Sequence, residues 1–208
     1  MKYLFLVRRF FICAGISAAA IFFASCNNDS DKDKTSGDTT NKETVNPITP
    51  DPADEPMVTH AEATINAVYT DTTVTGKAVF DGETSGKVKM VLELTIPAKA
   101  NKEVAVHIHE HGDCSDNANM AHGHWNPGNK QHGKWGTDSY HAGDIGNVKL
   151  DAKGKGTLTL ETDLWTLGGV PEKNILGKAL IVHGGTDDYV TQPTGNAGSR
   201  IGCGVINK

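Results

Sequence analysis

Residues 87–96 read KVKMVLELTI, a run in which polar and large apolar side chains largely alternate. Successive side chains of a β-strand point to opposite faces of a sheet, so this alternation predicts a strand with one buried face. Short β-prone runs of similar character occur at residues 61–69, 76–80, 103–109, 146–150, 156–160 and 179–183. The turn signals between them are Asp81-Gly82, Ser85-Gly86, Lys153-Gly154 and Gly184-Gly185. With no long helical periodicity, the pattern predicts an antiparallel sandwich or barrel.

Two long segments interrupt this rhythm. Residues 110–143 and 184–199 are rich in Gly, His, Asp, Asn and Pro. Loops of this length inside a compact domain are usually functional or disordered. They are therefore the first place to look for a site.

The first 25 residues have the pattern of a secretory signal. Basic residues come first, then an apolar run, then small residues before a cysteine: Lys2, Arg8 and Arg9, residues 10–23, Ala24-Ser25 and Cys26. The small residues resemble a bacterial lipobox, although Phe23 replaces the usual leucine. We expect residues 1–25 to be removed and Cys26 to carry a lipid that anchors the protein to a membrane. A plain cleaved signal and an uncleaved anchor are the alternatives.

A polar tether is expected at residues 26–57, because this stretch has too few apolar side chains to offset its ordering entropy. Residues 58–208 then form the folded domain. All three readings of the N-terminus export this domain, so we expect a lipid-anchored protein of the periplasm or cell surface.

The net charge limits the possible partners, and the cysteine content agrees with export. Removing the signal takes away three of the 20 basic residues and none of the 25 acidic ones, which leaves a net charge of −8. This charge argues against a nucleic-acid partner. Cys13 is lost with the signal and Cys26 is the lipid site, so Cys114 and Cys203 remain. In an oxidising compartment these two suggest one disulfide.

Eight of the nine histidines lie between His107 and His183. On a strand, His107 and His109 project from the same face and can share a metal, although two histidines on a solvated face would look identical. Downstream, three nitrogens and one oxygen suit tetrahedral zinc, namely those of His124, His132, His141 and Asp144. His183 ends a strand at the mouth of the sheet, where it could complete a copper site.

The combined motifs resemble the copper/zinc superoxide dismutase family. They are His107-Ile108-His109-Glu110, Gly123-His124-Trp125-Asn126-Pro127, Lys130-Gln131-His132-Gly133, residues 141–147 and residues 195–204. The resemblance extends from about residue 60 to the C-terminus. It implies an all-β fold, a Greek-key antiparallel β-sandwich or flattened barrel with two long functional loops and an immunoglobulin-like architecture. The short segment 184–199 lacks the charged insert of eukaryotic members, which is typical of the bacterial extracytoplasmic type.

The resemblance also assigns residues. It implies copper bound by His107, His109, His124 and His183, and zinc bound by His124, His132, His141 and Asp144, with His124 as a bridging imidazolate. Asp187, rather than its neighbour Asp188, is expected to orient one ring of each metal group. Arg200 and Thr194 would form the substrate channel, and His124 and Arg200 would act in catalysis. Cys114 and Cys203 would tie the first long loop to the sheet.

The implied activity is dismutation of superoxide to dioxygen and hydrogen peroxide with one copper and one zinc per chain, which would protect the cell envelope. A metal-storage module and an adhesion domain are the competing hypotheses, because fold does not fix function. His111 and His122 match no ligand position, and we interpret them as exposed loop residues or as auxiliary copper contacts. The assembly is expected to be a monomer or a homodimer.

Overall fold

The computed structural model describes residues 56–208, so the expected signal, Cys26 and nearly all of the tether lie outside the described residues. Eight strands and two short 3₁₀-helices are formed in this part of the chain. They are β1 (His60–Ala67), β2 (Thr75–Gly82), β3 (Val88–Thr95), η2 (Pro97–Lys99), β4 (Glu103–His109), η3 (Asn119–Ala121), β5 (Gly146–Lys149), β6 (Lys155–Thr162), β7 (Ala179–His183) and β8 (Arg200–Val205). None of the helices among these residues is long and apolar enough to cross a bilayer.

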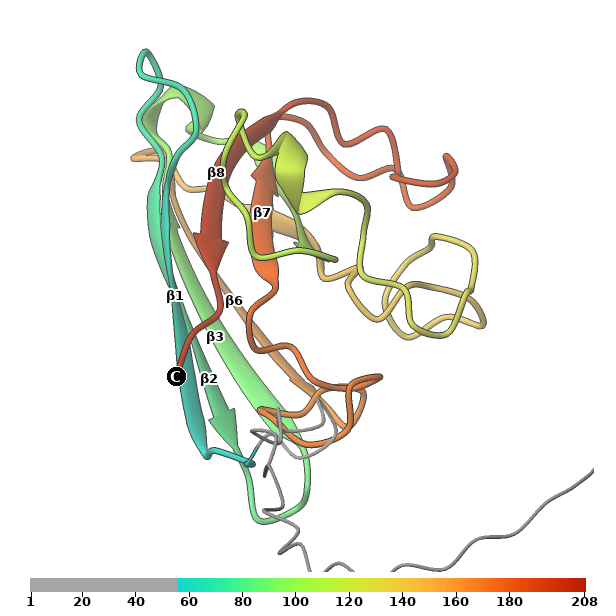
Figure 1. Ribbon diagram of the computed structural model, residues 1–208. Helices are drawn as coiled ribbons and strands as arrows, with labels where there is room; N and C mark the ends of the chain where they lie inside the picture. Colours follow the sequence, from blue (N-terminus) through green and yellow to red (C-terminus); the bar gives the residue numbers. More distant parts are fainter. Residues whose placement is uncertain (1–55) are drawn as a thin grey trace, which may run out of the picture. The chain divides into compact units, whose positions relative to one another are not determined.

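The eight strands form one antiparallel sheet in the order β5-β4-β7-β8-β1-β2-β3-β6. The edge strands β5 and β6 also approach each other, so the sheet curls into a nearly closed barrel (Figure 1). The connections β3–β4, β5–β6 and β6–β7 pass between the two halves of the sheet, as in a Greek-key arrangement. The predicted all-β class is confirmed.

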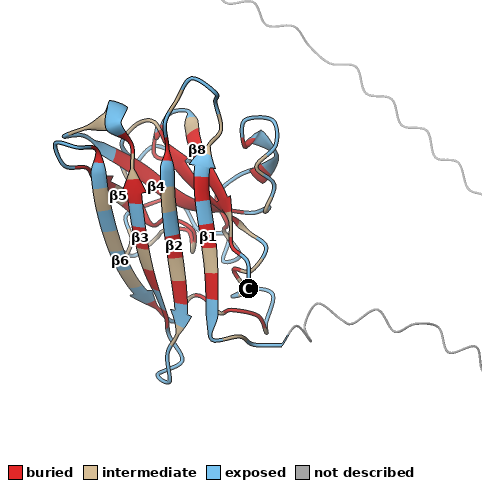
Figure 2. Cartoon of the chain, turned by 90° about the vertical axis from the view of Figure 1, so that its left-hand side faces the viewer, coloured by how far each residue is buried: buried red, intermediate tan, exposed pale blue. Residues whose placement is uncertain are grey.

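Strand β3 shows why the sequence alternates. Val88, Met90, Leu92 and Leu94 are buried in the core, whereas Lys89 and Glu93 between them are exposed. Figure 2 shows the same banding of buried and exposed residues along β1, β2 and β3, whose outer faces meet solvent. Because the side-chain period of a strand is two, a shift by one residue would reverse the two faces.

Strands β4 and β7 differ from β1–β3 because they are buried on both faces. All residues of β7, and all of β4 after Glu103, are buried. The loops after β4 and between β7 and β8 lie beside β7 and β8 on the side away from β1 and β3 (Figure 1). Polar side chains on this second face of β4 and β7 are therefore shielded from water.

Strand β8 has no counterpart among the β-prone runs of the sequence analysis. Its glycines explain both why it was missed and why it packs tightly. A Cβ at Gly204 would meet the backbone oxygen of Thr64 at 2.5 Å, and one at Gly202 would meet a methyl of Val74 at 2.8 Å. Glycine is poor in strand propensity but permits this close approach.

The disulfide joins Cys114, in the loop after β4, to Cys203 in the middle of β8. Their Cα atoms are 5.8 Å apart and 89 positions apart in the sequence. The bond therefore holds the first long loop against the sheet, and the predicted pairing is confirmed.

Candidate metal centre

Four imidazole rings meet on one face of the antiparallel pair β4 and β7. His107 and His109 lie on β4, which pairs with β7, and His183 is the last residue of β7. His124 reaches the same place because an isolated β-bridge joins it to His109. All four side chains are buried, and one ligand atom from each lies within 4.8 Å of the others.

In each of these four rings, one nitrogen is hydrogen-bonded to an oxygen of the protein and the other nitrogen is not. Nδ1 of His109 donates to the carbonyl of His122 at 2.8 Å, and Nδ1 of His183 donates to the carbonyl of Gly198 at 3.3 Å. Their Nε2 atoms lie 3.4 Å apart. The backbone thus fixes both rings so that their Nε2 atoms face each other.

A second group of donors surrounds Asp144. Oδ1 of Asp144 lies 2.8 Å from Nδ1 of His124 and 3.1 Å from Nδ1 of His141, and Oδ2 lies 2.9 Å from Nδ1 of His132. Asp144 and the three histidines are buried. The backbone amides of Gly133 and His141 donate to Oδ2, which orients the carboxylate. His124 belongs to both groups, with its two nitrogens on opposite sides of one ring.

Unsatisfied nitrogens test whether these groups fit metal ions. Nδ1 of His107 and Nε2 of His124 are buried and have no hydrogen-bond partner among the described residues. Nδ1 of His132 is also buried, and its contact with Oδ2 of Asp144 at 2.9 Å does not have the geometry of a hydrogen bond. A buried polar atom without a partner costs about 1–3 kcal/mol, so such atoms are rare unless they serve another purpose. Each of them lies in one of the two donor groups. Imidazole nitrogens with one carboxylate are suitable ligands for copper and zinc.

Asp187 connects the two groups. Its Oδ2 accepts from Nε2 of His107 at 2.8 Å, and its Oδ1 accepts from Nε2 of His132 at 3.0 Å. Both rings are thereby turned so that Nδ1 is the free nitrogen. Asp188 is exposed, and its carboxylate accepts instead from the amides of Val190 and Thr191. The structure thus places Asp187, and not Asp188, between the rings.

Sequence reasoning missed several residues that hold this arrangement. Asn147 accepts from the amide of Asp187 at 2.8 Å and donates to its carbonyl at 2.9 Å. Gln192 makes the same kind of reciprocal pair with the backbone of His132, at 2.9 Å in both directions. A Cβ at Gly195 would overlap Oδ1 of Asp187, so only glycine fits there. Asn147 and Gly195 stand inside the quoted motifs, but no local pattern indicates these contacts, and Gln192 carries no signal.

Burial and neighbouring charges set the protonation of the rings. Burial, and then the charge of nearby histidines, lowers the pKa of His183 to about 3 and that of His109 well below its usual range. Burial also lowers the pKa of His124 to about 4, although the hydrogen bond to Asp144 opposes this. These rings are therefore neutral at pH 7, as metal ligands must be.

The group around Asp144 has the opposite balance. Burial lowers the pKa of His132, but the adjacent carboxylates of Asp144 and Asp187 outweigh it and raise this pKa to about 9. Burial raises the pKa of Asp144 and of Asp187, yet hydrogen bonds from the histidines hold both well below the usual range. Both carboxylates are therefore ionised at neutral pH, and a cation between the rings would be stabilised by them.

Arg200 begins β8 beside the histidines. Its guanidinium donates to the carbonyls of Ala118 and His122. Its positive charge contributes to the lowered pKa values of His109 and His183, after the larger effect of burial. Thr194 is exposed in the loop between β7 and β8, next to Gly195.

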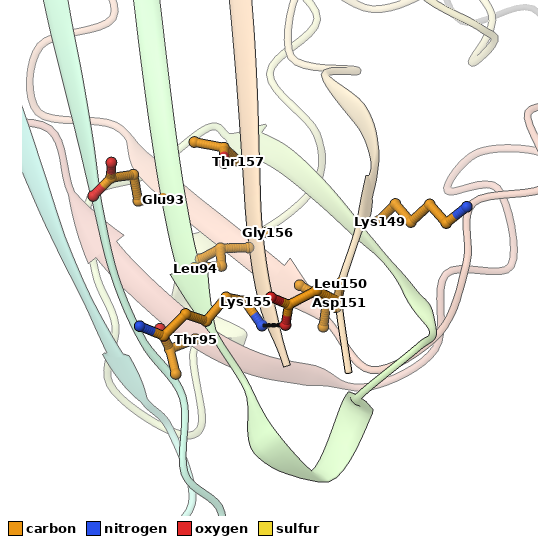
Figure 3. A pocket seen from close by; sticks show the side chains of 9 residues that line it. All are labelled: Glu93, Leu94, Thr95, Lys149, Leu150, Asp151, Lys155, Gly156 and Thr157. Atoms are coloured by element: carbon orange, nitrogen blue, oxygen red, sulfur yellow. Dashed lines mark hydrogen bonds between the residues drawn. The ribbon is translucent and has the colours of Figure 1, made fainter. Parts of the chain in front are cut away.

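A cavity of about 660 Å³ lies away from the histidines, near the end of β5 and the start of β6. Figure 3 shows its lining side chains, with the amide of Lys155 hydrogen-bonded to Asp151. No histidine lines it. The cavity follows the gap between the two edge strands and is separate from the metal-type groups.

Known proteins share this fold and these residues. A family model described as copper/zinc superoxide dismutase (SODC) matches residues 74–206. The chain is 40% identical over 152 residues to superoxide dismutase [Cu-Zn] 2 of Aquifex aeolicus, covering 71% of this chain and 85% of that protein. It is 37% identical over 149 residues to superoxide dismutase [Cu-Zn] of Podospora anserina, covering 68% and 95%. The crystal structure of the clock protein EA4 is also similar, with a TM-score of 0.63 and 33% identity over 73% of this chain and 96% of that one.

The family model spans well over half of the chain, and the chain covers 85% of the Aquifex relative and 95% of the Podospora relative. The two donor groups supply the imidazoles and the carboxylate that copper and zinc require. The chain therefore belongs to the copper/zinc superoxide dismutase family, oxidoreductases that dismute superoxide with one copper and one zinc ion.

Proposed function

We propose a residue-by-residue assignment of the two metals. Copper is bound by His107, His109, His124 and His183, and zinc by His124, His132, His141 and Asp144. One observation carries this assignment: the two buried donor groups share only His124, and its Nδ1 faces Asp144 while its Nε2 has no partner. A ring that belongs to both groups is what an imidazolate bridge requires.

When bound, copper supplies one-electron redox chemistry, and zinc supplies positive charge and fixed geometry. The protein's own residues do the remainder. Asp187 holds His107 and His132 in the orientation that frees Nδ1. His124 holds a proton at Nε2 when this nitrogen is otherwise free and delivers it to the peroxide product.

Arg200 is proposed to attract and orient superoxide. The mature chain carries a net charge of −8, so an anion needs a local positive group at the site. The guanidinium remains charged at any physiological pH and is anchored by two backbone carbonyls beside His109 and His183. Thr194 is proposed to narrow the same channel.

The assignment is tested by metal content and superoxide consumption of the purified chain after loading with copper and zinc. His132→Ala should lose zinc and retain copper, because only the zinc group contains His132. His109→Ala should lose superoxide consumption. His60→Ala is the matched control, since this exposed histidine lies outside both groups. Equal consumption by wild type and His109→Ala would remove the proposed role of the copper group.

Export and lipid anchoring are also proposed. Residues 1–25 are a signal peptide, residues 26–57 are the lipidated Cys26 and its tether, and residues 58–208 are the enzyme domain. The basic, apolar and small residues that end at Cys26 support this division. Labelling with a radioactive fatty acid tests it: Cys26→Ser should abolish labelling, whereas Cys13→Ser should not. Labelling that persists in Cys26→Ser would contradict the anchor.

This arrangement suits the bacterial extracytoplasmic type, in the periplasm or at the cell surface, where the enzyme would protect the cell envelope. The short loop between β7 and β8 and the signal pattern support this placement. Cells with Cys26→Ser should release the enzyme from the membrane fraction and survive external superoxide less well. The assembly is proposed to be a monomer or a homodimer, which sedimentation of the purified chain distinguishes.

A further inference from the structure

A third cluster of metal-type donors lies outside both groups. Glu110, His111 and His122 are exposed, and one ligand atom from each lies within 4.8 Å of the others. Among the described residues, this is the one group of potential metal donors that the proposed copper and zinc sites do not use. Glu110 and His111 follow directly after His109 in the chain, and His122 lies two positions before His124.

The backbone brings the three residues together. The chain leaving β4 runs antiparallel to the segment before His124, with the amide of Glu110 donating to Gly123 at 3.0 Å and that of His111 donating to Ala121 at 3.2 Å. The rings of His111 and His122 are consequently 4.4 Å apart at an angle of 73°. The nearby disulfide at Cys114 ties this part of the loop to β8. The cluster is thus built on a fixed loop.

The backbone of His122 gives a second reason to assign a role. It has φ 61° and ψ −142°, a conformation that glycine adopts readily and other residues rarely do. Holding a non-glycine residue there costs on the order of 1–3 kcal/mol. Glycine would satisfy the turn at lower cost, so the imidazole brings something that the fold itself does not need.

The chemistry of the cluster selects its ligand. Two imidazoles and one carboxylate are typical ligands of zinc and copper, whereas magnesium and calcium prefer oxygen alone. His60 is a useful contrast, because its two nitrogens are hydrogen-bonded to Asp81 at 2.7 Å and to Glu62 at 3.2 Å. Within residues 56–208, no such bonds engage the rings of His111 and His122.

We propose that Glu110, His111 and His122 form a third, solvent-exposed site for a divalent transition-metal ion, Zn²⁺ or Cu²⁺. The site adjoins the catalytic centre through one atom: the carbonyl of His122 accepts from Nδ1 of His109 and from Arg200. The proposal goes beyond the dismutase activity and does not depend on which residues bind the two catalytic ions.

Calorimetric titration of the copper- and zinc-loaded chain with Zn²⁺ tests this site. Wild type should bind one additional Zn²⁺ per chain, and Mg²⁺ should give no comparable heat. His111→Ala and His122→Gly should each weaken this additional binding by more than about tenfold, since losing even an outer partner of a ligand costs roughly 10–100-fold in metal affinity. His122→Gly also suits the backbone, so a loss there is not a folding defect. His60→Ala should bind as wild type does.

Two results would overturn the proposal. One is that loaded wild type takes up no further Zn²⁺. The other is that the additional Zn²⁺ binds equally well to His111→Ala and His122→Gly, which would place it elsewhere on the surface. Neither result depends on superoxide consumption, so this site and the proposed catalytic ligands are tested separately.

Discussion

Nε2 of His107 lies 2.8 Å from Oδ2 of Asp187, a contact between residues 80 positions apart in the chain. The other oxygen of this carboxylate holds His132, so Asp187 orients one ring of each donor group. Asp187→Asn should speed zinc loss to a chelator and lower metal affinity by roughly 10–100-fold, because the amide is uncharged and offers one acceptor oxygen. Asp188→Asn is the control. Equal zinc retention in the two variants would contradict the orienting role.

Gly195 is predicted to be essential for the zinc-side group. A Cβ there would overlap Oδ1 of Asp187 and lie 2.5 Å from Nε2 of His132. Gly195→Ala should therefore release zinc more readily, as measured by chelator competition. Gly198→Ala is a matched control because both glycines have positive φ, but a Cβ at Gly198 has its nearest neighbour at 3.5 Å. Similar zinc loss in both variants would assign the effect to backbone strain alone.

The disulfide should stabilise the folded chain. A cross-link between cysteines 89 positions apart restricts the unfolded chain by roughly 4–5 kcal/mol in the chain-entropy account. The double variant Cys114→Ser, Cys203→Ser should unfold at lower guanidinium concentration and be cut faster by protease in the loop after β4. Treatment of wild type with reductant should reproduce both changes. An unchanged unfolding midpoint would show that the bond does not contribute.

Arg200 should govern how quickly the anion arrives. Arg200→Gln is expected to lower kcat/KM by roughly tenfold or more, since electrostatic steering raises association rates by about 10–10³. Added salt should slow wild type and affect the variant less, because screening weakens the same attraction. Lys89→Gln on the exposed face of β3 removes the same charge far from the histidines and is the control. An equal salt dependence in Arg200→Gln would contradict steering by this residue.

The pKa of His60 is predicted to lie above its ordinary value of 6.5. The hydrogen bond to Asp81, and then that to Glu62, favours the protonated ring in the folded state. This contribution to stability is fully present below pH 6.5 and is lost as pH rises through the raised pKa. NMR titration of the ring should show the raised value, and Asp81→Asn should bring it back toward 6.5. A ring that titrates identically in Asp81→Asn and wild type would refute this.

The sequence predicted the sheet where side-chain alternation marks it. Strands β4 and β7 begin and end at the predicted residues, and β1, β2, β3, β5 and β6 differ from the predicted ranges by one or two residues at their ends. Strand β8 was missed because glycines occupy two of its six positions and break the alternation. Their role is visible only when Thr64 and Val74 are seen against them.

The donor set could be proposed from motifs because its residue types are chemically distinctive. The residues that hold those donors in place could not be predicted from motifs, because their contacts join distant parts of the chain through backbone groups. Gln192 meets the main chain of His132 from 60 positions away, and Asn147 meets that of Asp187 from 40. A glutamine or an asparagine in a polar loop carries no local signal of such pairing. The sequence likewise shows His111 and His122 as individual residues, but it does not indicate that their rings lie next to each other.

Burial of β4 and β7 on both faces has a consequence for how the protein exchanges its ions. Amide protons in these strands should exchange with water only when the sheet opens. The loop after His109 is held at Cys114 by the disulfide and at His124 by the bridge to His109, but the stretch after His124 can open locally at lower free energy. The histidines on the strands, and His124 beside them, therefore remain in place during such openings, while His132 and His141 move with their loop. The ion that His132 and His141 are proposed to bind should therefore exchange on the timescale of loop motion, without unfolding of the barrel.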